Sequence, residues 1–509
     1  MKLPIGIQTF SEIREGGFLY VDKTEHIHRI ITSGKYYFLA RPRRFGKSLL
    51  LSTIHELYEG NKRLFSGLWI EDQWNWNDKH PVIHLKFSSQ GLKTLGIEKA
   101  IFEMLREEST RLNIRLEKQE YDLQLRELIE KAGKNSKVVL LIDEYDKPII
   151  DFLDDLDQAR ENRQVLKNFY SVLKDSDPFL ELVFMTGVSR FAKTSIFSDL
   201  NNLSNLTMHR KAWILLGLTQ EEVDLYFEFN VQELAAESGM TLNELKAQIR
   251  QWYNGYSWNG RDKVYNPFSV LSYFEARQFD NFWFETGTPT FLLKTLRENW
   301  DYNIEKMEVS ASVLDNYDLE FLNPITILFQ TGYLTIEKEL AQGIYTLVYP
   351  NKEVRLSMEE KLLTSFSHDS RGSGRVHAYH LSNALRKGSV EDLVKILNAI
   401  FSSIPAELWQ KENEAFYHAL IHLTFSLMGA YIQSEIHSSN GRLDAKVETN
   451  DTVYILEFKL DRSAEEAIRQ IEEKGYFKPY LTADKKVVGI GINFSKEKKA
   501  VENWMVKVF

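Results

Sequence analysis

The sequence contains no cysteine among its 509 residues. This absence excludes disulfide bonds and zinc sites built on thiolates, and it fits a reducing compartment, so we expect a cytoplasmic protein. The first seventeen residues also lack a long apolar run and carry charges early. We therefore expect neither a signal peptide nor a membrane span there, and no membrane partner.

An excess of positive charge is missing as well. The chain has 63 Lys and Arg against 72 Asp and Glu, a formal net charge of −9, so any binding of nucleic acid must come from local basic patches. Hydrophobic residues make up 43% of the chain, which indicates a globular protein with an ample core. The length suits two to four domains, and no repeat or low-complexity tract interrupts it.

A basic loop separates an apolar strand, Tyr36–Leu39, from an amphipathic helix and ends in Gly46-Lys47-Ser48. At the start of such a helix, backbone N–H groups cradle phosphates, the lysine reaches the terminal phosphates and the serine hydroxyl meets Mg²⁺. Arg41 stands where the usual pattern has its first glycine. A chance loop with the same tripeptide is the alternative, and the flanking strand and helix favour the phosphate site.

Two carboxylates end the most apolar segment of this half. Residues 137–142 read as a buried parallel strand, and Asp143 and Glu144 follow it directly. Ligands bind at the carboxyl ends of parallel strands. We expect Asp143 to orient Mg²⁺ and Glu144 to polarise the water that attacks the γ-phosphate.

A third strand, Leu180–Thr186, follows, and residues 81–87 alternate as another. The alternation of strands and helices predicts an α/β fold with a parallel sheet and helices on both faces. Thr186, at the end of its strand, is a candidate γ-phosphate sensor. Arg190 is a candidate sensing or trans-acting cation, with a solvated arginine as the alternative.

These motifs resemble a family of ATPase-like proteins that carry a degenerate phosphate loop ahead of a restriction-type nuclease domain. The resemblance spans the chain and implies that ATP and Mg²⁺ bind in the N-terminal half, with Arg44 among the loop residues that hold the nucleotide. It rests on these segments: Tyr20–Thr24, Arg41–Ser48, Leu141–Asp146, Gly187–Phe191 and Trp252–Tyr256.

The middle of the chain predicts two further modules. Charged helical patterns from Thr219 to Tyr253 indicate a lid that closes over the nucleotide. The aromatic stretch 252–260 either stacks on bases or packs a loop onto a core, and packing is favoured. Residues 325–350 read as helix, strand, turn and strand, which is winged-helix-like. The predicted parts are an AAA-like P-loop ATPase domain (1–215), a helical lid (216–305), a winged-helix-like module (306–366) and a nuclease-like domain (375–509), with a polar linker at 367–374.

A second constellation lies near the end of the chain, in two alternating segments joined by the turn 449–452. Glu457 and Lys459 share one face of their strand, and pairing across the hairpin brings Asp444 beside them. Two carboxylates on adjacent strands are suitable oxygen ligands for Mg²⁺, and the lysine can orient or deprotonate a water. An ordinary hairpin with exposed charges is the alternative.

The order of elements around this hairpin, α-β-β-α-β, is similar to the PD-(D/E)XK nuclease core, a restriction-endonuclease-like α/β fold. That resemblance implies that Asp444 and Glu457 are metal ligands and Lys459 is the catalytic lysine. It also implies a first-helix acid at Glu414 that adds a metal ligand, and an accessory set of Gln470 and Tyr476. Ser434-Glu435 is expected just before the first strand.

The favoured hypothesis is an ATPase that gates a metal-dependent phosphodiesterase, with Mg²⁺ or Mn²⁺ as cofactor and DNA favoured over RNA. Bacterial defence against foreign DNA and a homo-oligomer are further expectations from this architecture. One alternative is an ATP-dependent switch or assembly protein whose nuclease-like domain binds without cutting. The other is an ATPase that remodels a protein partner.

Overall fold

The computed structural model describes most of the chain in two units. Residues 1–287 and 304–354 form unit 1, and residues 288–303 and 355–509 form unit 2. The chain passes from one unit to the other within helix α16 (Lys352–Ser365). The described residues are 2–87, 91–190, 196, 202–283, 306–315, 319, 323–365, 373–404, 414–429, 433–439, 442–481 and 485–509.

The centre of unit 1 is a five-stranded sheet in the order β2-β3-β4-β1-β5, and all of its paired strands are parallel. Every residue of β1 and β3 is buried, as expected for strands covered on both faces. The predicted parallel sheet of a P-loop fold is therefore confirmed. Its strands are β1 (Tyr36–Ala40), β2 (Val82–Lys86), β3 (Val138–Asp143), β4 (Leu180–Gly187) and β5 (Ser204–Asn205).

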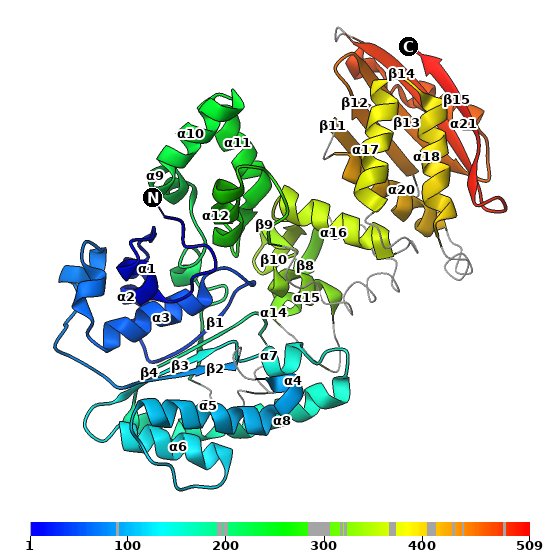
Figure 1. The fold of residues 1–509 in the computed structure, drawn as a ribbon. Coiled ribbons are helices and arrows are strands. Elements are labelled where there is room, and N and C mark those ends of the chain that lie inside the picture. Colours follow the sequence, from blue (N-terminus) through cyan, green and yellow to red (C-terminus); the bar gives the residue numbers. More distant parts are fainter. Residues whose placement is uncertain are drawn as a thin grey trace. The chain divides into compact units, whose positions relative to one another are not determined.

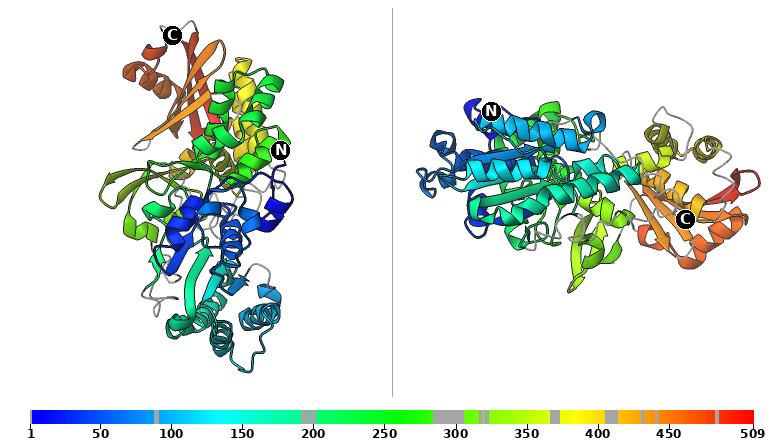
Figure 2. Two further views of the ribbon diagram at one scale, coloured as in Figure 1. Left: turned by 90° about the vertical axis from the view of Figure 1, so that its left-hand side faces the viewer. Right: turned by 90° about the horizontal axis from the view of Figure 1, so that it is seen from below.

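Helices cover both faces of this sheet (Figure 1). Helix α3 (Lys47–Tyr58) lies on one face, with α1 (Phe10–Glu15) and α2 (Thr24–Ile31) nearby. The other face carries α5 (Ile97–Arg111), α6 (Tyr121–Ala132) and α8 (Leu156–Asp175), which lie side by side when the molecule is seen from below (Figure 2, right). Two short helices, α4 (Leu92–Leu95) and α7 (Lys147–Ile150), precede α5 and α8.

Four helices after the sheet form the predicted lid, around a shared apolar core that includes Phe227, Tyr253 and Phe274. Capping boxes start two of them, at Thr219 and Thr241, and the Asn266 side chain caps the last. A two-stranded ribbon, β6 (Asn254–Tyr256) and β7 (Val264–Tyr265), precedes that last helix. The lid helices are α9 (Gln220–Tyr226), α10 (Glu228–Ser238), α11 (Leu242–Tyr253) and α12 (Pro267–Ala276).

A three-stranded antiparallel sheet, β8-β10-β9, completes unit 1. Its order of helix, strand, turn, strand and helix agrees with the winged-helix-like prediction, and Gly343 supplies the left-handed turn residue (φ 71°). The predicted linker lies mostly outside the described residues. The elements are β8 (Met307–Ser310), α14 (Ala311–Asp315), α15 (Pro324–Thr331), β9 (Thr335–Ala341), β10 (Ile344–Val348) and then α16.

Unit 2 contains a mixed sheet in the order β11-β12-β13-β14-β15, in which only the β13–β14 pair is parallel. The predicted α-β-β-α-β core is present as α20 (Glu414–Met428), β12 (Arg442–Glu448), β13 (Thr452–Leu460), α21 (Ala464–Lys474) and β14 (Lys486–Ser495). Helices α17 (Ser373–Arg386) and α18 (Val390–Ser402) precede it.

Two strands of this sheet were not predicted: β11 (Gln433–Ser439) and β15 (Ala500–Val508). Ser434 and Glu435 therefore do not precede the first strand but lie inside it, where Glu435 pairs with Lys446. The sequence of β11 is polar, and in β15 the apolar row of Trp504, Val506 and Val508 is interrupted by the apolar Met505, so neither strand shows a strict alternation of apolar and polar residues.

Candidate nucleotide and nuclease sites

The phosphate loop joins β1 to α3, and Gly46 allows its last turn by adopting φ 90° at the helix cap. Lys47 is the first residue of α3 and is buried. Its Nζ donates to the backbone carbonyls of Arg41 (2.9 Å) and Pro42 (3.0 Å), so the side chain folds back over its own loop. Burial lowers the pKa of Lys47, and the nearby Asp143 and Glu144 oppose that effect.

The acidic end of β3 and the polar end of β4 meet as predicted, because these strands are neighbours. Thr186 Oγ1 donates to Asp143 Oδ1 at 2.7 Å, and both side chains are buried. Asp143 and Ser48 line one polar cavity of about 380 Å³. A hydroxyl and a carboxylate that share a polar cavity are a donor set suited to Mg²⁺.

Glu144 directly follows that strand and is half-buried in a left-handed conformation (φ 52°). Burial raises the pKa of its carboxyl, which the Lys47 ammonium partly offsets. A carboxylate with a raised pKa is a better proton acceptor, which suits the predicted role in activating water.

Sequence reasoning missed the role of Asp146. Its Oδ2 accepts hydrogen bonds from Val188 N (2.9 Å), Ser189 N (2.6 Å) and Ser189 Oγ (2.8 Å), and the residue is buried. These bonds hold the segment after Thr186 against the turn after β3. Asp146 was part of a family motif, but its partners lie more than forty residues away along the chain, so spacing alone gave no signal.

Arg41 explains how the loop forms without its first glycine. The guanidinium is buried and donates to the carbonyls of Ala40 (2.9 Å), Thr207 (2.8 Å) and Ala212 (2.7 Å). It also stacks 3.7 Å from the ring centroid of Trp258. Burial lowers the pKa of Arg41 to about 9. The side chain thus has a binding pocket of its own and anchors the loop.

The aromatic stretch from 252 to 260 packs against the loop, as the favoured interpretation predicted. The Phe45 ring meets Tyr256 and Trp258 edge-on, with centroids 4.9 and 5.7 Å apart. Trp283 Nε1 donates to Arg43 O at 3.1 Å. The guanidinium of Arg44 lies 3.6 Å from the centroid of the Phe268 ring, on α12.

Arg190 lies beside residues from the middle of the chain. Its backbone N–H donates to Gln330 Oε1 at 2.9 Å, and the residue lines a small cavity with Arg41 and Trp258. The structure therefore brings together Lys47, Ser48, Asp143, Glu144 and Thr186, but it places Arg44 and Arg190 against the middle of the chain.

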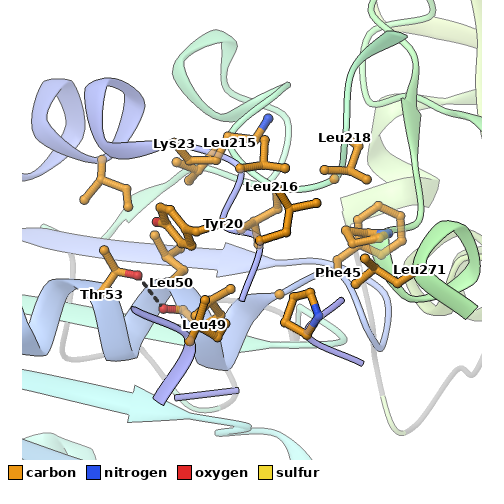
Figure 3. A pocket seen from close by; sticks show the side chains of 18 of the residues that line it. Tyr20, Lys23, Phe45, Leu49, Leu50, Thr53, Leu215, Leu216, Leu218 and Leu271 are labelled. Carbon is orange, nitrogen blue, oxygen red and sulfur yellow. Dashed lines mark hydrogen bonds between the residues drawn. The ribbon is translucent and has the colours of Figure 1, made fainter. Parts of the chain in front are cut away.

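An apolar cavity of about 120 Å³ opens beside the loop (Figure 3). Phe45 and Gly46 form its side toward the phosphate loop, and Leu271 comes from the lid. Apart from Lys23 and Thr53, the walls are mainly aliphatic and aromatic, a surface that suits the flat face of a nucleotide base. Its labelled lining includes Tyr20, Leu49, Leu50, Leu215, Leu216 and Leu218.

Glu353, in the first turn of α16, binds the backbone of Trp283, whose indole contacts the phosphate loop. Its Oε1 accepts from Trp283 N at 2.7 Å, and the side chain is fully buried. Burial raises the pKa of this carboxyl to about 7.

Glu353→Gln is therefore expected to stabilise the protein at pH 8 and to change little at pH 4. The folded state binds this proton more tightly than the unfolded state, so the wild type loses stability as pH rises from the ordinary glutamate pKa to about 7. The amide keeps an acceptor for Trp283 N without that loss. Thermal unfolding at both pH values measures the difference, and Glu360→Gln, a half-buried residue of the same helix, is the control. Equal shifts at the two pH values would contradict the assignment.

The second site lies on the sheet of unit 2. Backbone pairing sets Asp444 opposite Glu457, as the hairpin prediction requires. Glu457 is fully buried, and its Oε1 accepts from Lys459 Nζ at 2.6 Å. The same Nζ donates to Gln470 Oε1 of α21, also at 2.6 Å. The structure thus brings three of the predicted residues into direct contact.

The other predicted members of this site are less fully described. Helix α20 begins at Glu414, but the side chains of Glu414 and Asp444 lie outside the described residues. Tyr476 packs on the apolar cluster around Ile471. Among the described side chains, no group of three or more His, Asp and Glu gathers as a metal site would. The strand of Glu457 pairs with that of Asp444, and carboxylate oxygens are the kind of ligand that Mg²⁺ and Mn²⁺ prefer.

Comparison with known proteins matches the two regions of the chain that contain these residues. Residues 4–197 match a family model described as a predicted AAA-ATPase, and residues 412–504 match the PD-(D/E)XK nuclease superfamily. The chain belongs to the family of AAA-ATPase-like proteins that carry a PD-(D/E)XK nuclease-superfamily domain. It is 37% identical over 526 residues to a protein of Azotobacter chroococcum mcd 1 named "Uncharacterized protein in vnfD 5'region", and the match covers 99% of each chain.

Among the helices in the described part of the chain, none has both the length and the apolar character that crossing a membrane requires.

Proposed function

We propose that the protein is a nucleotide-gated, Mg²⁺-dependent nuclease that acts on nucleic acid, with DNA favoured over RNA. ATP binds and is hydrolysed in unit 1 and controls cutting in unit 2. The observation that carries the proposal is the contact of Lys459 Nζ with both Glu457 and Gln470 at 2.6 Å, on a strand paired so that Glu457 faces Asp444. Defence of a bacterial cell against foreign DNA is a role that suits such an activity.

In the nuclease site, Glu457 and Asp444 would hold the metal, with Glu414 as a further ligand. When bound, Mg²⁺ or Mn²⁺ polarises the phosphodiester and lowers the pKa of a water. Gln470 and Glu457 fix the Lys459 ammonium in one position, so that it can donate to the attacking water or to the phosphate. The Lys459 side chain is only 11% exposed, so its ammonium is largely shielded from water, and charge interactions are stronger there than at the surface.

In the nucleotide site, the apolar cavity receives the base and Lys47 exchanges its carbonyl partners for phosphate oxygens. Ser48 and Asp143 would hold Mg²⁺, which neutralises developing charge on the phosphates. Glu144 accepts the proton of the attacking water. Thr186 acts as the γ-phosphate sensor, because its hydrogen bond to Asp143 responds to the phosphates bound beside that carboxylate.

Two contacts within unit 1 support gating. Trp283 Nε1 binds the carbonyl of Arg43 in the phosphate loop, and Gln330 of α15 binds the backbone N–H of Arg190 beyond β4. Residues that follow the lid helices therefore contact both the phosphate loop and the segment after Thr186. If ATP binding moves the loop or that segment, the contacts of α15 and of the first turn of α16 change as well.

The test is cleavage of supercoiled and linear DNA in Mg²⁺ or Mn²⁺, with and without ATP. We expect wild-type protein to cut and its rate to change with ATP, because the two sites share one chain. Asp444→Ala is expected to lose cutting while it keeps ATP turnover. A control with single-stranded and duplex RNA decides the substrate class.

Absence of cutting on every substrate, with ATP turnover intact, would overturn the nuclease proposal. It would favour an ATP-dependent switch or assembly protein that binds nucleic acid or a partner through its nuclease-like domain. Cutting that is independent of ATP would overturn gating alone.

A further inference from the structure

Strand β15 forms one edge of the unit 2 sheet (Figure 1). Its second half is both apolar and exposed to solvent. No strand in the described part of the chain pairs with its outer side. Four of its last five residues are large hydrophobic residues that are well exposed to solvent: Trp504 (41%), Met505 (37%), Val506 (44%) and Val508 (56%). Natural sheets protect such edges with charges, prolines or covering elements, and an unprotected apolar edge is a template for another strand.

The exposed residues divide between the two faces of the strand. Trp504, Val506 and Val508 pair with Ile492, Ile490 and Val488 of β14, and all three β14 residues are buried. Three apolar side chains thus continue the core-facing row of the neighbouring strand into solvent. Met505 and Lys507 lie on the opposite face.

We propose that β15 pairs antiparallel with β15 of a second copy of this chain, around a two-fold axis at Val506. Such an interface is isologous, so one strand supplies both halves of it. The backbone groups on the outer side of β15 would gain partners, as in other cases of strand addition.

The sequence of β15 favours a second β15 as the strand that pairs with its outer edge. A two-fold axis perpendicular to the sheet keeps each side chain on its own face, so residues of equal parity lie opposite one another. With the axis at Val506, Trp504 lies opposite Val508 of the second copy, and Val506 meets its own copy. All directly opposed side chains on this face are therefore apolar.

Charges agree with the same register. Lys507 lies opposite Met505 of the second copy, so the two lysines do not meet, and Lys507 already pairs with Glu472 of its own chain. Glu502 lies beyond the paired segment. Like charges placed directly opposite each other destabilise strand pairs, and this register contains none.

The pairing would join two five-stranded sheets into one and place two nuclease-like sites in one assembly. If the proposed nuclease activity is correct, such a dimer can cut both strands of a duplex in one encounter. Dimerisation itself does not depend on that activity, because the contact involves only β15.

The test is sedimentation velocity of the full chain over a wide range of concentration. We expect wild type to form a reversible dimer. Val506→Lys and Val506→Glu each place like charges at the two-fold axis, so each is expected to raise the dimer dissociation constant about a hundredfold. An equimolar mixture of the two variants is expected to recover the dimer, because the charges are then opposite. Val376→Lys, at an exposed valine of α17, is the matched control and is expected to leave the dimer unchanged.

A wild type that remains monomeric at all concentrations overturns the proposal and leaves the edge to a different partner. A dimer that survives both Val506 variants, or a mixture that fails to recover it, also overturns it. None of these readouts needs nuclease or ATPase activity, so a failure here is distinct from a failure of the proposed function.

Discussion

Glu457→Gln is expected to lower DNA cleavage at least about a thousandfold, the scale on which loss of charge stabilisation acts on catalysis. The carboxylate is fully buried, and its Oε1 accepts from Lys459 at 2.6 Å. Glutamine keeps an oxygen for that hydrogen bond and nearly the same shape, but it removes the negative charge that would bind the metal under the proposed function. The change therefore separates metal binding from packing.

Two measurements check this expectation: the cleavage rate, and the binding of Mn²⁺ followed by electron paramagnetic resonance. Both should fall in Glu457→Gln. Glu448→Gln is the matched control, because Glu448 also accepts a lysine, Lys485, at 2.9 Å in the same sheet. It should leave cleavage and Mn²⁺ binding unchanged. Removing one partner of a buried ion pair also destabilises, so a lowered unfolding temperature is expected for Glu457→Gln. Cleavage within tenfold of wild type would contradict the assignment of Glu457 as a metal ligand.

The strands that carry both sites could be predicted because their own residues specify them. The continuous apolar run of β3 and the apolar segment of β13, which is buried on both faces, are local patterns, and turn residues bound the hairpin. The position of Asp143 beside Thr186 then followed from one rule, that carboxyl ends of parallel strands meet at one edge. The register of Asp444 with Glu457 followed in the same way from the turn.

The contacts that could not be predicted from the sequence join residues far apart along the chain. Arg41 was seen only as a missing glycine, because its partners Thr207 and Ala212 lie more than 160 residues away. The contact of Trp283 with the phosphate loop spans 240 residues and has no periodic signal. The edge strand β15 was missed for another reason: it has a neighbouring strand on one side only and most of its residues are exposed, so burial imposes no clear pattern on its sequence.

Lys47→Met is expected to weaken ATP binding about a hundredfold, the equivalent of one or two charge-assisted hydrogen bonds. In the structure the ammonium is buried and donates to two carbonyls of its own loop. Phosphate oxygens carry negative charge and are better acceptors than carbonyls, so ATP should displace them. Burial lowers the pKa of Lys47 and disfavours its charged form, and the nearby Asp143 and Glu144 offset this only in part, so phosphate oxygens that bind the ammonium should relieve the remaining cost.

Methionine keeps most of the volume and removes that cost, so Lys47→Met without nucleotide should be at least as stable as wild type. Thermal unfolding with and without MgATP tests both statements, because a ligand that binds only the folded state raises the unfolding temperature with its concentration. We expect that rise in wild type and its loss in Lys47→Met. Lys147→Met is the control: Lys147 also lies near Glu144 but pairs with Asp151 at 3.0 Å, and it should keep the rise. An equal rise in Lys47→Met and wild type would mean that ATP binds without this lysine, and the folded-back ammonium would then be a structural contact of the loop.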